Sequence, residues 1–422
     1  MRVCGACPLA PPGVRPGRLR RGVRRWGGGG AWALSPSPPR SWSAGGRRGA
    51  GPPRAAGSTP PLPPPFLDSP PDLVAEEVSA FAPATIANIG PGFDFFGMAV
   101  KGAGGRTLGD TVTARVSDKV PSGRVAMRSI VGDGGRLPME AGENTSGVAA
   151  QATLQLMGVP QADAGGGGVE LELRKGLPLG SGLGSSAASA AAAAWAVNGL
   201  YGFPLSKAEL VHAGLQAEAK VSGYHADNVG PSLTGGFNLI PSYDPLTIVP
   251  LEFKGPEPYM VVVNPRHEVR TADARAALPA DVPLASLIAY ASASALLSAA
   301  IGSGDAQMLG RAVNSDCVVE PARKGLIPGF DEVKAAALAA GATGCSISGA
   351  GPTMFAVVDD ADGGLSLAEA VAREMQAAFK QFANLESTAF VMQLDSDGAK
   401  VIDTQLPDEP PEWLAQGMPE LN

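Results

Sequence analysis

The residues best suited to chemistry form a loop rich in glycine and serine near the middle of the chain. Before it, residues 169–173 alternate between apolar side chains and glutamate, which predicts a half-exposed strand. After it, an alanine-rich run predicts a helix that stops at Asn198 or Gly199. Glycines let backbone N–H groups approach phosphate oxygens, and a helix start offers unpaired N–H groups with partial positive charge. The order strand, loop, helix therefore predicts a phosphate site.

The spacing within this loop narrows the kind of phosphate site. Ser185 and Ser186 at the helix start can cap the helix, bind phosphate or place a hydroxyl on Mg²⁺. The loop has no lysine, so it does not match the Walker A pattern, and its glycines at 180, 182 and 184 do not match G-x-G-x-x-G. A dinucleotide-binding oxidoreductase is therefore disfavoured. The plainer alternative is a tight strand-to-helix turn without a ligand.

Composition and charge limit the possible partners. The chain has 422 residues, of which 45% are hydrophobic and 17% charged, a globular composition. Eleven of its 33 Lys and Arg residues, but none of its 40 Asp and Glu residues, precede Asp68, so residues 68–422 carry 22 basic residues and a formal charge of −18. The negative charge of residues 68–422, the body of the chain, argues against binding of nucleic acid or an anionic membrane. We count no run of 18 strongly apolar residues and expect no membrane span.

The first 76 residues differ from the rest and read as a leader. They are rich in Arg, Gly, Pro, Ser and Ala, which is typical of an organelle transit peptide, and the alternative is a disordered tail. We expect cleavage within residues 50–76 and a location in the chloroplast, with the mitochondrion as the alternative. In the body, Cys317 and Cys345 are isolated and predict neither a disulfide nor a metal site.

Periodicity in the body predicts strands and helices mixed without regular alternation, which indicates an α+β fold. Strands are expected at 78–82, 169–173 and 259–264, and paired strands at 111–131 and at 342–347 with 353–358. Helices are expected at 144–157, 206–220, 284–309 and 329–340, the second of them opened by a capping box. We place an N-terminal domain at 77–250, a C-terminal domain at 251–405 and a tail at 406–422.

Five segments together resemble the motifs of one family. They are PLGSGLGSSAA at 178–188, PATIANIGPGFD at 83–94, YHADNV at 224–229, LIPGF at 326–330 and SISGAGPT at 346–353. The first resembles the phosphate loop of the GHMP kinases, and the others resemble the homoserine kinase branch of that family, over residues 78–400. The resemblance implies ATP-dependent phosphorylation of the L-homoserine hydroxyl in threonine biosynthesis. It also implies a two-domain fold, a ribosomal-protein-like α/β domain followed by a ferredoxin-like one, and a homodimer.

The resemblance also implies roles for the residues that match the motifs. For ATP it implies Pro178, Leu179, Gly180, Ser181, Gly182, Leu183, Gly184, Ser185, Ser186, Ala187 and Ala188, with Asn144 near the base. For Mg²⁺ it implies Ser186 and Glu218. For binding and reaction of homoserine it implies Asn88, Asp94, His225, Asn228, Thr271, Arg275 and Arg323, with Gly349 and Gly351 in the C-terminal glycine turn.

Residue chemistry agrees with this assignment, because an amino acid needs a carboxylate for its ammonium and arginine for its carboxylate. Asp94, Arg275 and Arg323 supply those charges, although a turn aspartate and solvated arginines are the ordinary alternatives. Asp227 is the residue to test if a catalytic base exists. Two alternative functions stay open: another GHMP kinase, for example one of isoprenoid synthesis, and a relative that binds ATP without catalysis.

Overall fold

The computed structural model describes residues 59–104 and 107–402. The predicted leader up to residue 58 and the predicted tail at 406–422 lie outside the described residues. The strands are β1 (Glu77–Ala87), β2 (Phe96–Gly102), β3 (Gly109–Pro121), β4 (Val125–Val131), β5 (Gly167–Arg174), β6 (Phe237–Tyr243), β7 (Leu246–Leu251), β8 (Tyr259–Pro265), β9 (Gly344–Ile347), β10 (Met354–Val358), β11 (Ser387–Leu394) and β12 (Lys400–Val401).

The α-helices of the described residues alternate irregularly with these strands. They are α1 (Thr145–Leu156), α2 (Ser185–Leu200), α3 (Lys207–Val221), α4 (Val229–Thr234), α5 (Thr271–Ala276), α6 (Leu284–Ser303), α7 (Ala306–Val313), α8 (Val319–Arg323), α9 (Phe330–Ala339) and α10 (Gly364–Ala378). The capping box predicted at the start of α3 is confirmed, since Ser206 and Glu209 each bond the other's backbone.

Strand β1 belongs to two parts of the sheet. Its first half pairs with β3, from Glu77 opposite Arg115 to Pro83 opposite Gly109, and its second half pairs with β2. From β2 the sheet continues through β11, β8 and β10 to β9. Strand β2 therefore lies among strands of the C-terminal half, and the boundary that we place near residue 250 stays a prediction. The predicted pairing of residues 342–347 with 353–358 is confirmed as β9 and β10.

The hairpin predicted within residues 111–131 is wrong. Strands β3 and β4 form there, but β5 lies between them, antiparallel to β3 and parallel to β4. Alternation shows that a strand has one buried face, but it carries no information on which strand lies beside it. Strand β1 also runs five residues beyond the predicted strand, to Ala87.

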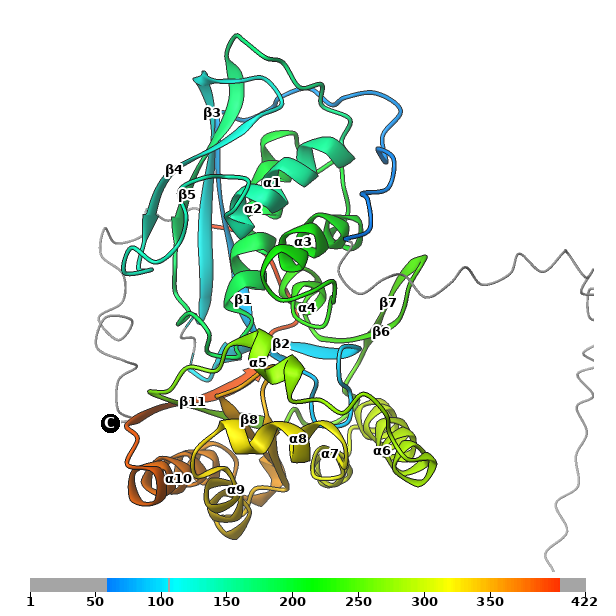
Figure 1. Cartoon of the computed structure of the whole chain (residues 1–422), viewed down its shortest axis with the longest axis vertical. Coiled ribbons are helices and arrows are strands. Elements are labelled where there is room, and N and C mark those ends of the chain that lie inside the picture. The colour runs from blue at the N-terminus through cyan, green and yellow to red at the C-terminus, as the bar shows by residue number, and fades with distance from the viewer. Residues whose placement is uncertain (1–58, 105–106, 403–422) are drawn as a thin grey trace, which may run out of the picture. The chain divides into compact units, whose positions relative to one another are not determined.

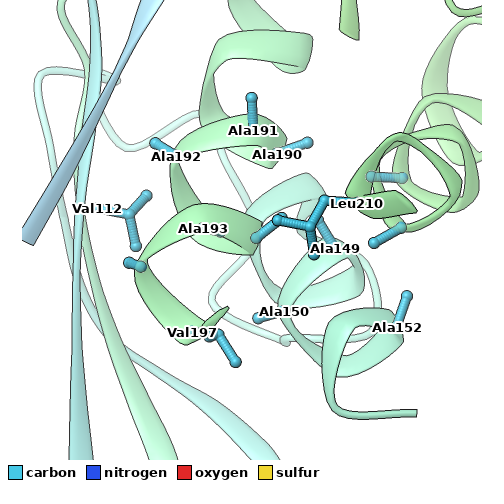
Figure 2. Close-up of a cluster of buried hydrophobic side chains, with 14 of the residues drawn as sticks. Val112, Ala149, Ala150, Ala152, Ala190, Ala191, Ala192, Ala193, Val197 and Leu210 are labelled. Carbon is cyan, nitrogen blue, oxygen red and sulfur yellow. The ribbon is translucent and has the colours of Figure 1, made fainter. Parts of the chain in front are cut away.

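Helix α2 packs between the sheet and two other helices, and its alanines make this packing possible. In Figure 1, α1, α2 and α3 lie together on one side of β1, β3 and β5, and α2 contacts all of them. Ala190 to Ala194 are fully buried, and Figure 2 shows alanines of α1 and α2 beside Val112 of β3 and Leu210 of α3. Small side chains on every face let several neighbours approach one helix closely. This close packing fixes the first turn of α2 relative to the sheet.

The long helix predicted at 284–309 is two helices. Gly304 has φ +69° and ends α6, and the Asp305 side chain accepts from the Met308 N–H at 2.7 Å and caps α7. By length and composition alone α6 is apolar enough to cross a membrane, and 22% of its most apolar window is buried. Our search of the sequence for 18 consecutive strongly apolar residues did not find α6, because serines interrupt its apolar residues.

Residues 60–75 run along the helices of the N-terminal half. The Phe66 N–H donates to the Leu156 carbonyl at 2.9 Å, and the Val74 N–H donates to the Leu200 carbonyl at 2.8 Å. The Gln216 side chain donates to the Pro60 carbonyl at 2.8 Å. This segment therefore packs on the body from Pro60 onward.

Candidate active site

The predicted phosphate loop joins β5 to α2 and leaves the start of α2 open. Gly184 precedes the helix with φ +67° and caps it with no side chain, so the first N–H groups of α2 have no side-chain partner. A Cβ on Gly184 would lie 2.0 Å from the Thr85 hydroxyl, and a Cβ on Gly182 would lie 2.5 Å from the Ser348 carbonyl. Glycine is required at both positions by conformation and by space.

A buried ion pair lies behind this loop. Lys175 contacts the carboxylate of Asp110, and its ammonium also donates to the Ser185 carbonyl at 2.9 Å and to the Ser189 hydroxyl at 2.8 Å. Both charged side chains are almost fully buried, and Lys175 lines the cavity described below. The lysine therefore ties the end of β5 to the first turn of α2. We did not single out Lys175 from the sequence, although a lysine directly before a glycine loop was the available signal.

The loop at residues 88–94 meets the C-terminal glycine turn through Asn88. Asn88 and Asp94 have φ of +69° and +64°, which is uncommon outside glycine. The Asn88 amide donates to the Gly349 carbonyl at 2.9 Å, and its oxygen accepts from the Asp94 N–H at 3.0 Å. Its side chain thus orients Asp94 and joins two motifs that are 261 residues apart.

Asp94 forms a bidentate ion pair with Arg275. The guanidinium donates to the two carboxylate oxygens at 2.8 and 3.1 Å, and it also donates to the Ser222 carbonyl at 3.2 Å. Tyr243 holds this loop from the other side, because its hydroxyl donates to the Asp94 carbonyl at 2.8 Å and accepts from the Ala226 N–H at 2.9 Å. Tyr243 was not predicted as a site residue, and no motif marks it.

Arg323 carries a buried positive charge without a carboxylate partner among the described residues. Only 3% of the residue is exposed, and it donates to the carbonyls of Ala274 and Gly349, each at 3.0 Å. Burial lowers the pKa of Arg323, and the nearby charge of Asp94 acts in the opposite direction. A buried guanidinium that faces a cavity and lacks a carboxylate favours an anionic ligand.

His225 is held as a cation between two acceptors. Its Nδ1 faces Asp227 at 3.2 Å and its Nε2 faces the Ser222 carbonyl at 3.0 Å, so both nitrogens carry a proton. Burial lowers the pKa of His225, but the hydrogen bond and charge of Asp227, aided by Asp94 and Glu218, outweigh it and raise the pKa to about 9. His225 and Asp227 therefore form an ion pair at neutral pH.

Ser186 and Glu218 fit a divalent cation. Glu218 is 2% exposed, and its Oε1 is buried without a hydrogen-bond partner, while its Oε2 accepts from the Ser222 hydroxyl at 2.6 Å. The Ser186 hydroxyl makes no hydrogen bond within the described part of the chain. Hard oxygen ligands that lack protein partners are the kind that Mg²⁺ takes.

One cavity of about 270 Å³ brings these groups together. Of the predicted residues, it is lined by Asn88, Asp94, Asn144, Leu179, Gly180, Ser181, Gly182, Gly184, Ser185, Ser186, Glu218, His225, Asn228, Thr271, Arg275, Arg323, Gly349 and Gly351. Asn144 uses its side chain on protein groups, since it accepts from the Ser146 N–H at 3.0 Å and donates to the Pro138 carbonyl at 2.9 Å. Asn228 likewise accepts from the Thr85 hydroxyl at 2.7 Å.

Four residues of the predicted ATP set do not line this cavity: Pro178, Leu183, Ala187 and Ala188. The side chains of the last three are buried in hydrophobic clusters. A contiguous motif includes residues that face the core, because neighbouring positions of a loop or helix point in different directions.

Comparisons with known proteins agree with the motifs. The model of the GHMP kinases N terminal domain matches residues 144–236, and the model named GHMP kinases C terminal matches residues 294–381. The chain is 48% identical to homoserine kinase of Arabidopsis thaliana over 335 residues, which are 79% of this chain and 87% of that protein. It is 41% identical to homoserine kinase of Chlorobaculum tepidum over 331 residues, which are 78% of this chain and 98% of that protein.

A solved structure gives the same result for the fold. The crystal structure of homoserine kinase from Cytophaga hutchinsonii superposes with a TM-score of 0.70 and 41% identity, covering 78% of this chain and 99% of that one. The predicted α+β fold is thereby confirmed as the two-domain GHMP kinase fold. By fold, by motif and by identity over nearly the whole length of its relatives, the chain belongs to the homoserine kinase family of the GHMP kinases.

Proposed function

We propose that this chain transfers the γ-phosphoryl group of ATP to the side-chain hydroxyl of L-homoserine, giving O-phospho-L-homoserine for threonine biosynthesis. One observation carries the choice of acceptor. Asp94, Arg275 and Arg323 lie together in the cavity that the phosphate loop also lines. A carboxylate for the ammonium and two guanidiniums for the carboxylate recognise an α-amino acid.

The residues of the chain act on this reaction by positioning and by charge. The backbone amides of the loop and the start of α2 hold the phosphates. Asp94, Arg275 and Arg323 form the acceptor half of the site, which holds the homoserine hydroxyl in line with the γ-phosphorus. The hydroxyl oxygen bonds to phosphorus as the bond to the ADP oxygen breaks, and the hydroxyl proton passes to a phosphate oxygen. A loose transition state requires little activation of the nucleophile, so no protein base is needed.

Mg²⁺ is part of the proposal, with Ser186 and Glu218 as its protein ligands. The buried, unpartnered Oε1 of Glu218 supports this assignment. When bound, the ion neutralises charge on the phosphates.

The substrate is tested with a panel of acceptors in an assay that couples ADP release to NADH oxidation. The panel contains L-homoserine, L-serine, L-threonine, mevalonate and galactose, each with Mg²⁺-ATP. We expect homoserine to have the highest kcat/KM, by at least about 10²-fold over mevalonate and galactose, because a site that pairs buried charges rejects ligands without them. Release of ADP with another alcohol but none with homoserine would overturn the proposal.

The homodimer and the location are also proposals. The exposed face of α6 carries Leu284, Leu287 and Ile288, and an apolar patch of this kind suits a second copy of the chain.

For the location, we propose import into the chloroplast. We place the cleavage before Pro60, because residues 60–75 pack on the body. Residues 1–59 fused to a fluorescent protein should enter chloroplasts. Mitochondrial or cytosolic fluorescence would contradict this.

A further inference from the structure

Phe93 lies between the two arginines of the acceptor half. The guanidinium carbon of Arg323 is 4.7 Å from the centre of the Phe93 ring, and that of Arg275 is 5.4 Å from it. Phe93 also lines the cavity. Attraction between a guanidinium and the face of an aromatic ring strengthens where the cation is desolvated, and Arg323 is buried.

A contact shared by the two guanidiniums opposes their mutual repulsion. Each is a cation that repels the other, and this repulsion contributes to the lowered pKa of Arg323. Arg275 has the carboxylate of Asp94, whereas Arg323 has two backbone carbonyls and the ring. The Phe93 ring thus lies within cation–π distance of both guanidiniums.

The position of the ring is fixed from α6. The Phe93 N–H donates to the Tyr290 hydroxyl at 3.0 Å, and the Ser294 hydroxyl donates to the Pro91 carbonyl at 2.6 Å. Two polar side chains of α6, Tyr290 and Ser294, therefore hold the loop that carries Phe93. These contacts give the ring a defined place.

We propose that Phe93 is a positioning residue that holds Arg275 and Arg323 at the spacing needed to bind the carboxylate of an α-amino acid. The inference rests on the proposed function and deepens it, because it names what sets selectivity for an amino acid over a plain amino alcohol. Phe93 acts on substrate binding and not on phosphoryl transfer.

The test compares kinetics for Phe93→Leu, Phe93→Tyr and the control Phe95→Leu. Phe95 does not line the cavity, and its ring lies beside Phe96. For Phe93→Leu we expect the KM for homoserine to rise about tenfold, in keeping with two cation–π contacts, while kcat and the KM for ATP stay within about twofold. Phe93→Tyr should restore the KM, and Phe95→Leu should leave it unchanged.

A substrate without the carboxylate separates positioning from general damage. 3-Amino-1-propanol has the ammonium and hydroxyl of homoserine but no carboxylate, so its kcat/KM should be the same in wild type and Phe93→Leu. An equal loss for both acceptors, or an unchanged homoserine KM, would overturn the inference. Wild type that does not phosphorylate homoserine would instead overturn the proposed function.

Fluorinated phenylalanines at position 93 decide the question even if Phe93→Leu does not fold. Successive fluorines weaken the negative face of the ring with little change in its shape. The homoserine KM should rise stepwise from one to five fluorines while the ATP KM stays constant. A flat series would contradict a role for the ring face.

Discussion

At the residue scale, the acceptor half of the site is a set of opposed charges held in a fixed order. Asp94 pairs with Arg275, His225 pairs with Asp227, and Arg323 has no carboxylate partner among the described residues. A zwitterion adds one positive and one negative charge to this set, so it supplies Arg323 with an anion without leaving Asp94 unbalanced. The pair of His225 and Asp227 leads to two predictions.

Asp227→Asn should keep measurable turnover. In the structure the Asp227 carboxylate faces His225, which makes it a partner for a cation, and a loose transition state needs no strong base. We expect kcat to fall by less than about 10²-fold, the lower end of what a general base contributes. Steady-state kinetics with saturating homoserine measures it. Activity at background, with a circular dichroism spectrum like that of wild type, would show that Asp227 is a base.

His225→Gln should remove part of the pH dependence of stability. The pKa of His225 is raised from 6.5 to about 9, so the folded state binds this proton more tightly than the unfolded state. The stabilisation is therefore fully present below pH 6.5 and is lost as the pH rises through about 9. In that window the free energy of unfolding of wild type should fall by up to about 1.4 kcal/mol per pH unit more steeply than that of the variant.

Urea denaturation at pH 6, 7, 8 and 9 measures these slopes. His212→Gln is the matched control for the slopes between pH 7 and 9, because burial lowers the pKa of His212 below its ordinary value of 6.5 and so away from the range in which His225 titrates. Its slope should equal that of wild type. If the free energy of unfolding changed with pH equally in His225→Gln and wild type, the ion pair of His225 and Asp227 would be refuted.

At the scale of elements, the site depends on how closely three loops approach one another. Residues 88–94, the phosphate loop and the C-terminal glycine turn meet where Gly349 accepts from both Asn88 and Arg323. Ser348 also donates to the Gly182 carbonyl at 2.7 Å. Glycine 182 and glycine 184 leave the space that these contacts need.

Gly184→Ala should damage ATP binding more than backbone strain alone explains. A left-handed φ costs a residue with a side chain about 1 kcal/mol, and the added Cβ also meets the Thr85 hydroxyl at 2.0 Å. We expect the KM for ATP to rise at least about tenfold and the free energy of unfolding to fall by about 2–4 kcal/mol.

Gly134→Ala is the matched control for this variant. Gly134 has φ +65°, close to the +67° of Gly184, but a Cβ there meets nothing within 4 Å. It should lose only about 1 kcal/mol and keep the KM for ATP. Equal effects at the two positions would show that the contact with Thr85 does not matter.

At the scale of the whole molecule, α6 presents several exposed apolar side chains on one face. Leu284, Leu287 and Ile288 are 71%, 53% and 59% exposed. Tyr290 and Ser294 of the same helix hold the loop that carries Phe93 and Asp94. In the proposed homodimer, a second copy of the chain would cover this face.

Ile288→Lys should convert a homodimer into monomers, because a buried unpaired charge in an apolar interface is costly. Sedimentation velocity measures the shift in mass. Phe382→Lys is the control, since Phe382 is 56% exposed and lies outside α6, and it should leave the dimer intact. A wild type that sediments as a monomer, or an Ile288→Lys variant that stays dimeric, would exclude this interface.

The sequence by itself determined the motifs and many of the elements. Alternation marked β5, the capping box at Ser206 marked the start of α3, and the loop between β5 and α2 marked a phosphate site. These signals are local, because periodicity and capping depend on residues up to four positions apart. The residue types around Asp94, Arg275 and Arg323 also indicated an amino acid before any contact was known.

Only the tertiary structure decided which of these parts meet. The insertion of β5 between β3 and β4 and the pairing of Asp94 with Arg275 across 181 residues left no local trace in the sequence. The position of Lys175 before the glycine loop did not show that it would be buried against Asp110. Each depends on the path of the chain, and a pattern of side chains shows which face of an element is buried without showing what covers it. For the same reason the loop at 180–186 indicated a phosphate, whereas the grouping of Phe93 with two arginines, which supports the choice of acceptor, required the fold.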